Sequence, residues 1–171
     1  MTGQRTVSRG LATVVILSLW LGAVLVVGTV VAPAAFAVLP TRSLAGALVG
    51  RVLPALFWSG AVVGLLVAVA GRGGGSIRWR TLLGVAVTGA CLAAQLLVAP
   101  RIARLRTDVA VPIDRLARED ARRIAFGRLH AASVALLGVA GLSAGAALFF
   151  TIRALTASAV RQGTSHPVHE R

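Results

Sequence analysis

Three arginines and one histidine beside long apolar segments are the side chains of this sequence best suited to bind a ligand. They are Arg51, Arg101, Arg128 and His130, which we call the Arg/His rim, and Ser133 follows three positions after the histidine. A guanidinium forms paired hydrogen bonds to phosphate and carboxylate groups, and an imidazole changes its charge near neutral pH. The rim therefore predicts a site for an anionic group. The competing interpretation is that these side chains only extend to lipid headgroups from the edges of membrane spans.

The sequence lacks the residues needed for acid-coupled transport, haem or copper binding, or a disulfide. The apolar segments contain no Asp or Glu, which disfavours transport coupled to a membrane-embedded acid. His130 is the only histidine in these segments and Met1 is the only methionine, so a two-histidine haem and a methionine copper path are excluded within one chain. Cys91 is the only cysteine and can form no disulfide within the chain. We expect no metal site, no cofactor and no enzymatic activity.

Four long apolar segments must position these residues. Hydrophobic residues make up 57% of the chain, charged residues 13%, and the mean hydropathy of +0.85 is too high for a water-soluble fold. A helix needs about 20 apolar residues to cross a hydrocarbon core of about 30 Å. The sequence predicts an all-α integral membrane protein, an antiparallel four-helix transmembrane bundle with spans near 11–33, 52–71, 81–100 and 129–152.

The strong positive charge indicates a membrane surface as the partner. The chain has 18 basic residues, all of them arginine, and 5 acidic residues, which gives a formal net charge of +13. These arginines lie in short stretches between the apolar segments and form no continuous stripe for a phosphate backbone. We expect contact with the lipid bilayer, and with an anionic lipid or small molecule, but not with nucleic acid.

The domain organisation follows the apolar segments. We predict an N-terminal flank over 1–10, a four-span transmembrane domain over 11–155 and a disordered polar tail over 156–171. The first apolar segment is longer than the core of a signal peptide, so we expect a retained helix. Pro33 should kink or end that helix, which leaves 34–40 as a turn or an interfacial piece.

The connection before the fourth span has the pattern of an amphipathic helix. Pro112 suits a first helical position, and Asp114 and Glu119 each precede an arginine by four residues, namely Arg118 and Arg123. This pattern predicts an interfacial amphipathic helix that leads into the fourth span, or else an ordinary solvated helix.

Small and polar residues inside the spans predict how the helices pack. Close packing of helices in lipid depends on small residues four apart, and prolines at span edges shape the helix ends. The candidate structural residues are Gly46/Gly50, Gly60/Gly64, Gly141/Gly145, Pro33, Pro54 and Pro100, and the polar ones that could bond across helices are Ser59, Thr88, Gln95 and Ser143. We expect each glycine pair to serve a contact within the chain, although a homo-oligomer or a membrane partner protein stays open.

An even number of spans places both termini and the 72–80 connection on one side of the membrane. The Arg/His rim then gathers on the other side, at the connections between the first two and the last two spans. Arg5 and Arg9 precede the first span, while only Arg42 follows it closely. We therefore expect a multi-pass protein of the cell membrane with cytoplasmic termini.

Several short motifs resemble the transmembrane protein 205-like family, a domain of unknown function. The motifs span roughly residues 11 to 155, and they are Leu19-Trp20-Leu21-Gly22, Ala32-Pro33, Phe36-Ala37-Val38-Leu39-Pro40, Arg51-Val52-Leu53-Pro54, Pro100-Arg101 and Phe126-Gly127-Arg128-Leu129-His130-Ala131-Ala132-Ser133. The resemblance implies a four-helix integral membrane protein and no established mechanism. Other members can carry an acid where this chain has Ala99, so acid-dependent chemistry is not implied here.

Two functions fit these patterns. In the first, the bundle binds or passes an anionic or amphiphilic small molecule or lipid at the Arg/His rim. In the second, the chain is a structural or assembly subunit of a membrane complex. Loss of ligand binding on substitution of Arg128 and His130 would favour the first.

Overall fold

The computed structural model describes the chain except for residues 1, 72–76, 108–112 and 165–171. Helices make up nearly all of the described part, which contains no strand. In chain order they are α1 (Thr2–Val26), η1 (Val27–Val31), α2 (Ala32–Val38), α3 (Arg42–Ala70), α4 (Ile77–Ala93), η3 (Ala94–Val98), α5 (Ala99–Thr107), η4 (Ile113–Arg115) and α6 (Ala121–Thr164).

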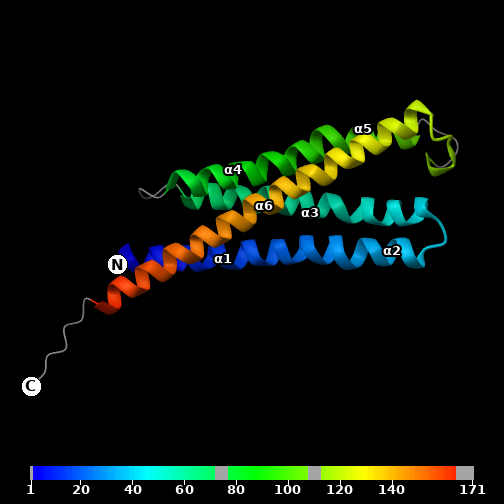
Figure 1. Cartoon of the computed structure of the whole chain (residues 1–171). Coiled ribbons are helices and arrows are strands. Elements are labelled where there is room, and N and C mark those ends of the chain that lie inside the picture. Colours follow the sequence, from blue (N-terminus) through cyan, green and yellow to red (C-terminus); the bar gives the residue numbers. More distant parts are fainter. Residues whose placement is uncertain (1, 72–76, 108–112, 165–171) are drawn as a thin grey trace, which may run out of the picture.

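Four helical segments are long and apolar enough to cross a membrane. They cover Val7–Val38, Arg42–Ala70, Trp79–Thr107 and Ala121–Val160, which confirms the expected all-α, four-span membrane fold. Figure 1 shows them running back and forth, with α6 crossing the others diagonally. The connections α2–α3 and α5–α6 lie at one end, which we call the loop end. The start of α1, the end of α3, the start of α4 and the end of α6 lie toward the other, the terminal end.

Pro33 does not end the first helix, although this is one of the two predicted outcomes, and residues 34–38 are helical rather than a turn. The helix continues to Val38, because the turn before the proline widens into the π-helical segment η1, in which Ala32 N–H donates to the carbonyl of Val27. A proline ring clashes with the carbonyl four residues earlier in a regular α-helix, and a local π turn relieves that clash. The same device recurs in the third span, where η3 immediately precedes Ala99-Pro100.

The first two spans are joined by a tight, capped turn. Leu39 is extended, at φ −77° and ψ 140°, as expected for a residue before Pro40. Thr41 then caps α3, since its side-chain oxygen accepts a hydrogen bond from Leu44 N at 3.2 Å. The second span consequently begins at Arg42, ten residues before the predicted start at 52, and it includes Pro54.

The connection before the fourth span differs from the predicted separate amphipathic helix. One short helical turn, η4, is followed by an irregular stretch, and α6 starts directly at Ala121. The expected pair between Glu119 and Arg123 does not form, because Arg123 donates to the carbonyl of Leu116 at 2.6 Å. Pro112 and the side chain of Asp114 lie outside the described residues.

Helix α6 extends past residue 155, after which we predict the polar tail. It continues to Thr164, because Ala157, Ala159, Arg161 and Gln162 are good helix formers, and residues 165–171 lie outside the described part.

The centre of the bundle is built around Gly60. A Cβ atom on this glycine would lie 2.5 Å from the Trp20 ring and 2.7 Å from Cys91 Sγ, so the missing side chain makes room for both. Trp20 Nε1 also donates to the carbonyl of Leu56 at 3.0 Å. Residues of α1, α3 and α4 therefore meet at one buried point.

The small-residue seams agree with prediction in α3 but not in α6. A Cβ on Gly64 would lie 2.7 Å from the Gly84 carbonyl oxygen, so α3 and α4 pack backbone to backbone there. Gly141 and Gly145 have open space at their Cβ positions and face no other helix of the chain closely. The seam of α6 is instead a fully buried row of small residues on the adjacent face, Ala140, Ala144, Ala147 and Thr151.

Polar residues inside the spans follow the predicted roles only in part. Thr88 donates across helices to the carbonyl of Ala61 at 3.2 Å, as expected. Ser59 donates within its own helix, to Leu56. Gln95 Oε1, in the widened segment η3, is buried and has no hydrogen-bond partner among the described residues.

Candidate functional site

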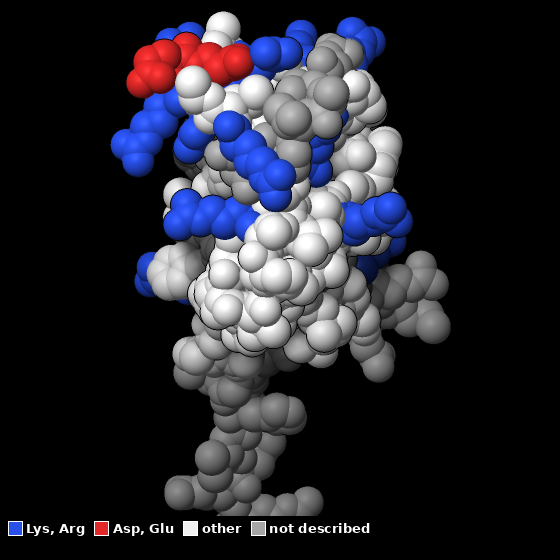
Figure 2. Space-filling view, turned by 90° about the vertical axis from the view of Figure 1, so that its right-hand side faces the viewer, with Lys and Arg blue, Asp and Glu red and all other residues white. Residues whose placement is uncertain are grey.

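The candidate site lies at the loop end. Figure 2 views this end and shows arginine side chains spread around it, with the acidic side chains gathered at one edge. The sequence explains this distribution, since four of the five acids, Asp108, Asp114, Glu119 and Asp120, belong to the α5–α6 connection. Arg106 stands two residues before Asp108, whereas Arg51, Arg101 and Arg128 have no acid within six residues in sequence.

Arg106 is the arginine that joins the helices at this end. It stands in the last turn of α5, where a cation is favoured by the helix dipole. Its guanidinium carbon lies 5.5 Å from the centre of the Phe126 ring in α6, and its Nη2 donates a long hydrogen bond of 3.4 Å to the carbonyl of Gly46 in α3. One exposed cation thus bridges α3, α5 and α6.

His130 joins this group through Phe126. The two rings are stacked, with centres 6.3 Å apart and planes 7° apart. This contact follows from helix geometry, because residues four apart lie on the same face of α6. The order Arg106, Phe126, His130 places a guanidinium, an apolar ring and an imidazole in a row.

Two glycines make room for the guanidinium. A Cβ on Gly50 would lie 3.3 Å from Arg106 Nη1, and one on Gly46 would lie 3.7 Å from Nη2. Pro54 lacks the N–H that would otherwise bond to the Gly50 carbonyl, so this carbonyl lacks its usual helical donor. The predicted glycine pair 46/50 therefore accommodates a side chain of α5.

The structure does not join the predicted rim residues to one another. Arg51, Arg128 and His130 are exposed and share no hydrogen bond, ion pair or ring contact within the described part. Arg101 turns back and donates to the carbonyl of Leu97 in its own helix. Ser133 is buried, whereas His130 is exposed.

Asp120, one of the acids at this end, is already paired with Arg122 at the start of α6. Asp120 caps α6 by accepting from Arg122 N at 2.8 Å, and its two oxygens accept from the Arg122 guanidinium at 3.2 and 3.1 Å. The hydrogen bonds from Arg122 hold the pKa of the Asp120 carboxyl below its ordinary value. This is the only ion pair in the described part of the chain, so Arg51, Arg101, Arg106 and Arg128 stay without a carboxylate partner there.

Sequence reasoning missed Arg106 and Phe126 as contributors. The signal for Phe126 was its position four residues before His130, but nothing in the sequence placed Arg106 over that ring. The contact depends on how α5 and α6 align across a connection that bends the chain back, and spacing does not specify that alignment.

The sequence profile of the domain of unknown function DUF4149 matches residues 15–110, which is more than half of the chain. The chain belongs to this family. The matched region runs from α1 through α5, so Gly46, Gly50 and Arg106 lie inside it, while Phe126 and His130 lie beyond its end. No curated protein and no solved structure matches the chain.

Proposed function

We propose that this membrane protein binds an anionic amphiphile, a lipid or a small molecule with an anionic group, at the loop end of the bundle. The observation that carries the proposal is the position of Arg106 over Phe126, next to His130, with no carboxylate paired to it in the described chain. Its guanidinium carbon lies over the aromatic ring, and a guanidinium has five N–H donors, so donors besides the one to Gly46 remain for an anion.

An amphiphile suits this place better than a fully water-soluble anion. Phe126 is half-buried and precedes the apolar stretch of α6, so a ligand here contacts both the cations and the hydrocarbon boundary. Arg51, Arg101 and Arg128 add positive charge around the same end without forming a closed cavity. The rim thereby supports attraction of an anionic headgroup, and the ring contacts support its orientation.

The test compares two arginines of the same helical turn. Arg106→Gln and Arg104→Gln each remove one exposed charge from the last turn of α5, but only Arg106 contacts Phe126 and Gly46. Lipids and metabolites that copurify with the full chain are quantified by mass spectrometry, along with those of Arg128→Gln/His130→Ala. We expect one anionic species to be lost with Arg106→Gln and with the double variant, and retained with Arg104→Gln. An unchanged ligand profile in all variants refutes the proposal.

The second candidate, an assembly subunit, is favoured by one observation. Gly141 and Gly145 have open space where other glycines of the bundle meet neighbours, so α6 has a small-residue face that its own chain leaves uncovered. Gly141→Leu/Gly145→Leu in the full chain tests this role. A shift to a smaller particle, or loss of a copurified partner, supports assembly, and an unchanged particle refutes it.

We also propose an orientation for the chain in the membrane and a wider family to which it belongs. We place the termini in the cytoplasm of a cell-membrane protein, because Arg5 and Arg9 precede the first span and the first span usually dominates. The resemblance of Phe126 to Ser133 to the transmembrane protein 205-like family supports membership in that group. Labelling of single cysteines at the two ends of the bundle tests the orientation.

A further inference from the structure

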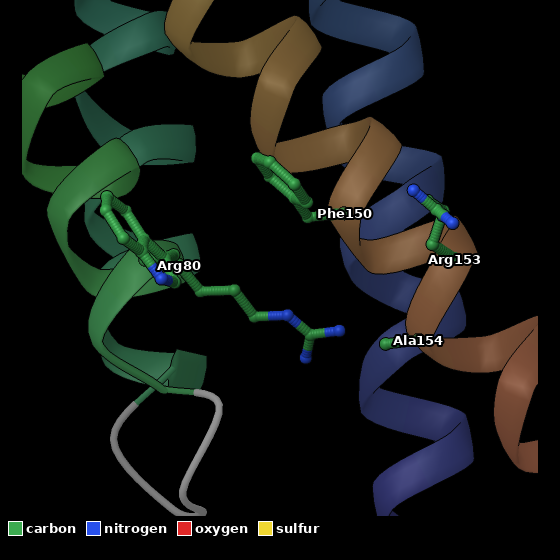
Figure 3. Close-up of a pocket in the computed structure, with 5 residues that line it drawn as sticks. Arg80, Phe150, Arg153 and Ala154 are labelled. Carbon is green, nitrogen blue, oxygen red and sulfur yellow. The ribbon is translucent and has the colours of Figure 1, made fainter.

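A basic hollow lies at the terminal end, away from the Arg/His rim. Its volume is about 290 Å³, and it is lined by Trp79, Arg80, Phe150, Arg153 and Ala154 (Figure 3). The lining residues come from the start of α4 and the later part of α6. We call this feature the α4–α6 hollow, and its size is near the lower end of typical ligand sites, about 300 Å³.

Arg80 supplies a cation that no described residue neutralises. Figure 3 shows its side chain extending from α4 across the hollow toward Ala154 on α6. The side chain is half-buried, yet its guanidinium has no hydrogen bond or ion pair with any described residue. A partly desolvated guanidinium without an acceptor gains more from an incoming anion than a fully hydrated one.

Arg153 supplies a second cation on the opposite wall. Its guanidinium carbon lies 5.6 Å from the centre of the Phe149 ring. A contact of this kind uses the flat face of the guanidinium and leaves the N–H groups in its plane available. The two arginines therefore line the same hollow, one from α4 and one from α6.

No described carboxylate competes for these two arginines. Four of the five acids belong to the α5–α6 connection at the loop end, and the fifth, Glu170, lies outside the described residues. An anion that pairs with Arg80 and Arg153 has to come from outside the described chain.

The position of the hollow favours a lipid over a free anion. Trp79 and Arg80 stand where the third apolar span begins, and Arg153 is the first charge after the apolar stretch 129–152. Trp79 is 68% exposed and Phe150 is 49% exposed, so both present apolar surface at this boundary. Tryptophan is typical of the interface between headgroups and hydrocarbon.

We propose that the α4–α6 hollow binds the phosphate group of an anionic phospholipid. Arg80 and Arg153 hold the phosphate oxygens, while Trp79 and Phe150 contact the glycerol and upper acyl region. The site is separate from the one proposed at the loop end and does not depend on it, since it shares no residue with the Arg/His rim.

The experiment measures binding of phosphatidylglycerol and phosphatidylcholine to the purified full chain by native mass spectrometry in detergent. The variants are Arg80→Gln and Arg153→Gln, and the control is Arg9→Gln, which removes the same charge at the terminal end but outside the hollow. We expect wild-type chain to prefer phosphatidylglycerol. Each hollow variant should weaken that binding about tenfold, as loss of a charge-assisted hydrogen bond implies, and Arg9→Gln should weaken it less.

A third variant keeps both charges and fills the space. Ala154→Phe places a ring in the hollow from an exposed helical position, so it should reduce phosphatidylglycerol binding even if a Gln variant misfolds. Equal weakening by Arg9→Gln and Arg80→Gln, or unchanged binding with Ala154→Phe, overturns the proposal. Displacement of the lipid by millimolar inorganic phosphate also overturns it, because the occupant is then a free anion.

Discussion

The backbone-to-backbone contact of α3 with α4 gives the sharpest prediction for stability. In Gly64→Ala, the new Cβ would lie 2.6 Å from Thr88 Oγ1 and 2.7 Å from both the Gly84 carbonyl oxygen and Thr88 N. Two of these three atoms belong to the main chain and cannot rotate away. Since ordinary contact begins at 3.4 Å, α3 and α4 must separate by about 0.7 Å.

The size of the effect follows from opposing contributions. Overpacking costs about 1–3 kcal/mol, and we expect the upper value because the opposing atoms are main-chain atoms. Alanine gains about 1 kcal/mol over glycine as a helix former, so the net loss for Gly64→Ala is about 2 kcal/mol. Gly141→Ala keeps only the gain, because nothing lies within 4 Å of its Cβ position. The two variants should therefore differ by about 3 kcal/mol.

The assay is reversible unfolding of the full chain in mixed micelles, followed by circular dichroism. Gly141→Ala serves as the matched control, since it makes the same chemical change in an equally helical segment. Equal free energies of unfolding for the two variants would refute the backbone-to-backbone packing of α3 on α4.

Three further predictions use the same measurement of stability. Trp20→Phe should lower the free energy of unfolding by about 1 kcal/mol through loss of its buried hydrogen bond, whereas Trp58→Phe, at a 48% exposed position, should change it little. Gln95→Leu should raise the free energy of unfolding by about 1–3 kcal/mol, because it removes a buried amide oxygen without a hydrogen-bond partner among the described residues. A loss of stability would mean that Gln95 Oε1 does have a hydrogen-bond donor. Asp120→Asn should lower the melting temperature at pH 7, because Arg122 depresses the carboxyl pKa and the charged form stabilises the fold. The difference in melting temperature between the variant and the wild type should shrink as the pH falls below 3.8, the ordinary pKa of the carboxyl group. It should vanish below the depressed pKa, and a difference that does not depend on pH would contradict this.

The number and nature of the spans could be predicted from the sequence, but their ends could not. Continuous apolar stretches leave little choice of structure in lipid, so the four helices followed directly. Charged residues such as Arg42 and Arg104 do not stop a helix, because arginine is a good helix former and its long side chain reaches water from a span edge. Both spans that contain these residues are therefore longer than their apolar parts.

The sequence pattern also did not identify the face of α6 that packs against the other helices. Glycine pairs and alanine rows both permit close packing, and the choice between two adjacent faces depends on which neighbours α6 meets. The structure buries Ala140 and Ala144 completely and leaves Gly141 and Gly145 without a close neighbour. A small shift in rotation about the helix axis, which local spacing does not encode, separates the two outcomes.

The site was predictable as a set of charges but not as a set of contacts. The sequence places Arg101 and Arg128 at span edges, and the structure keeps them at the loop end. The contacts that join helices there come from Arg106 and Phe126, because the bend between α5 and α6 brings those two turns together. The hydrophobic periodicity of α5 and of α6 does not determine how the two helices align.

The 44 residues of α6 make a rod about 66 Å long, roughly twice the thickness of the hydrocarbon core. Near one extremity it rests on α1, where Leu155 packs against Gly10, and near the other it carries Phe126 beneath the Arg106 guanidinium. A rod of this length exceeds the hydrocarbon core even when it is tilted, so its ends must extend into the headgroup layers or the water beyond them.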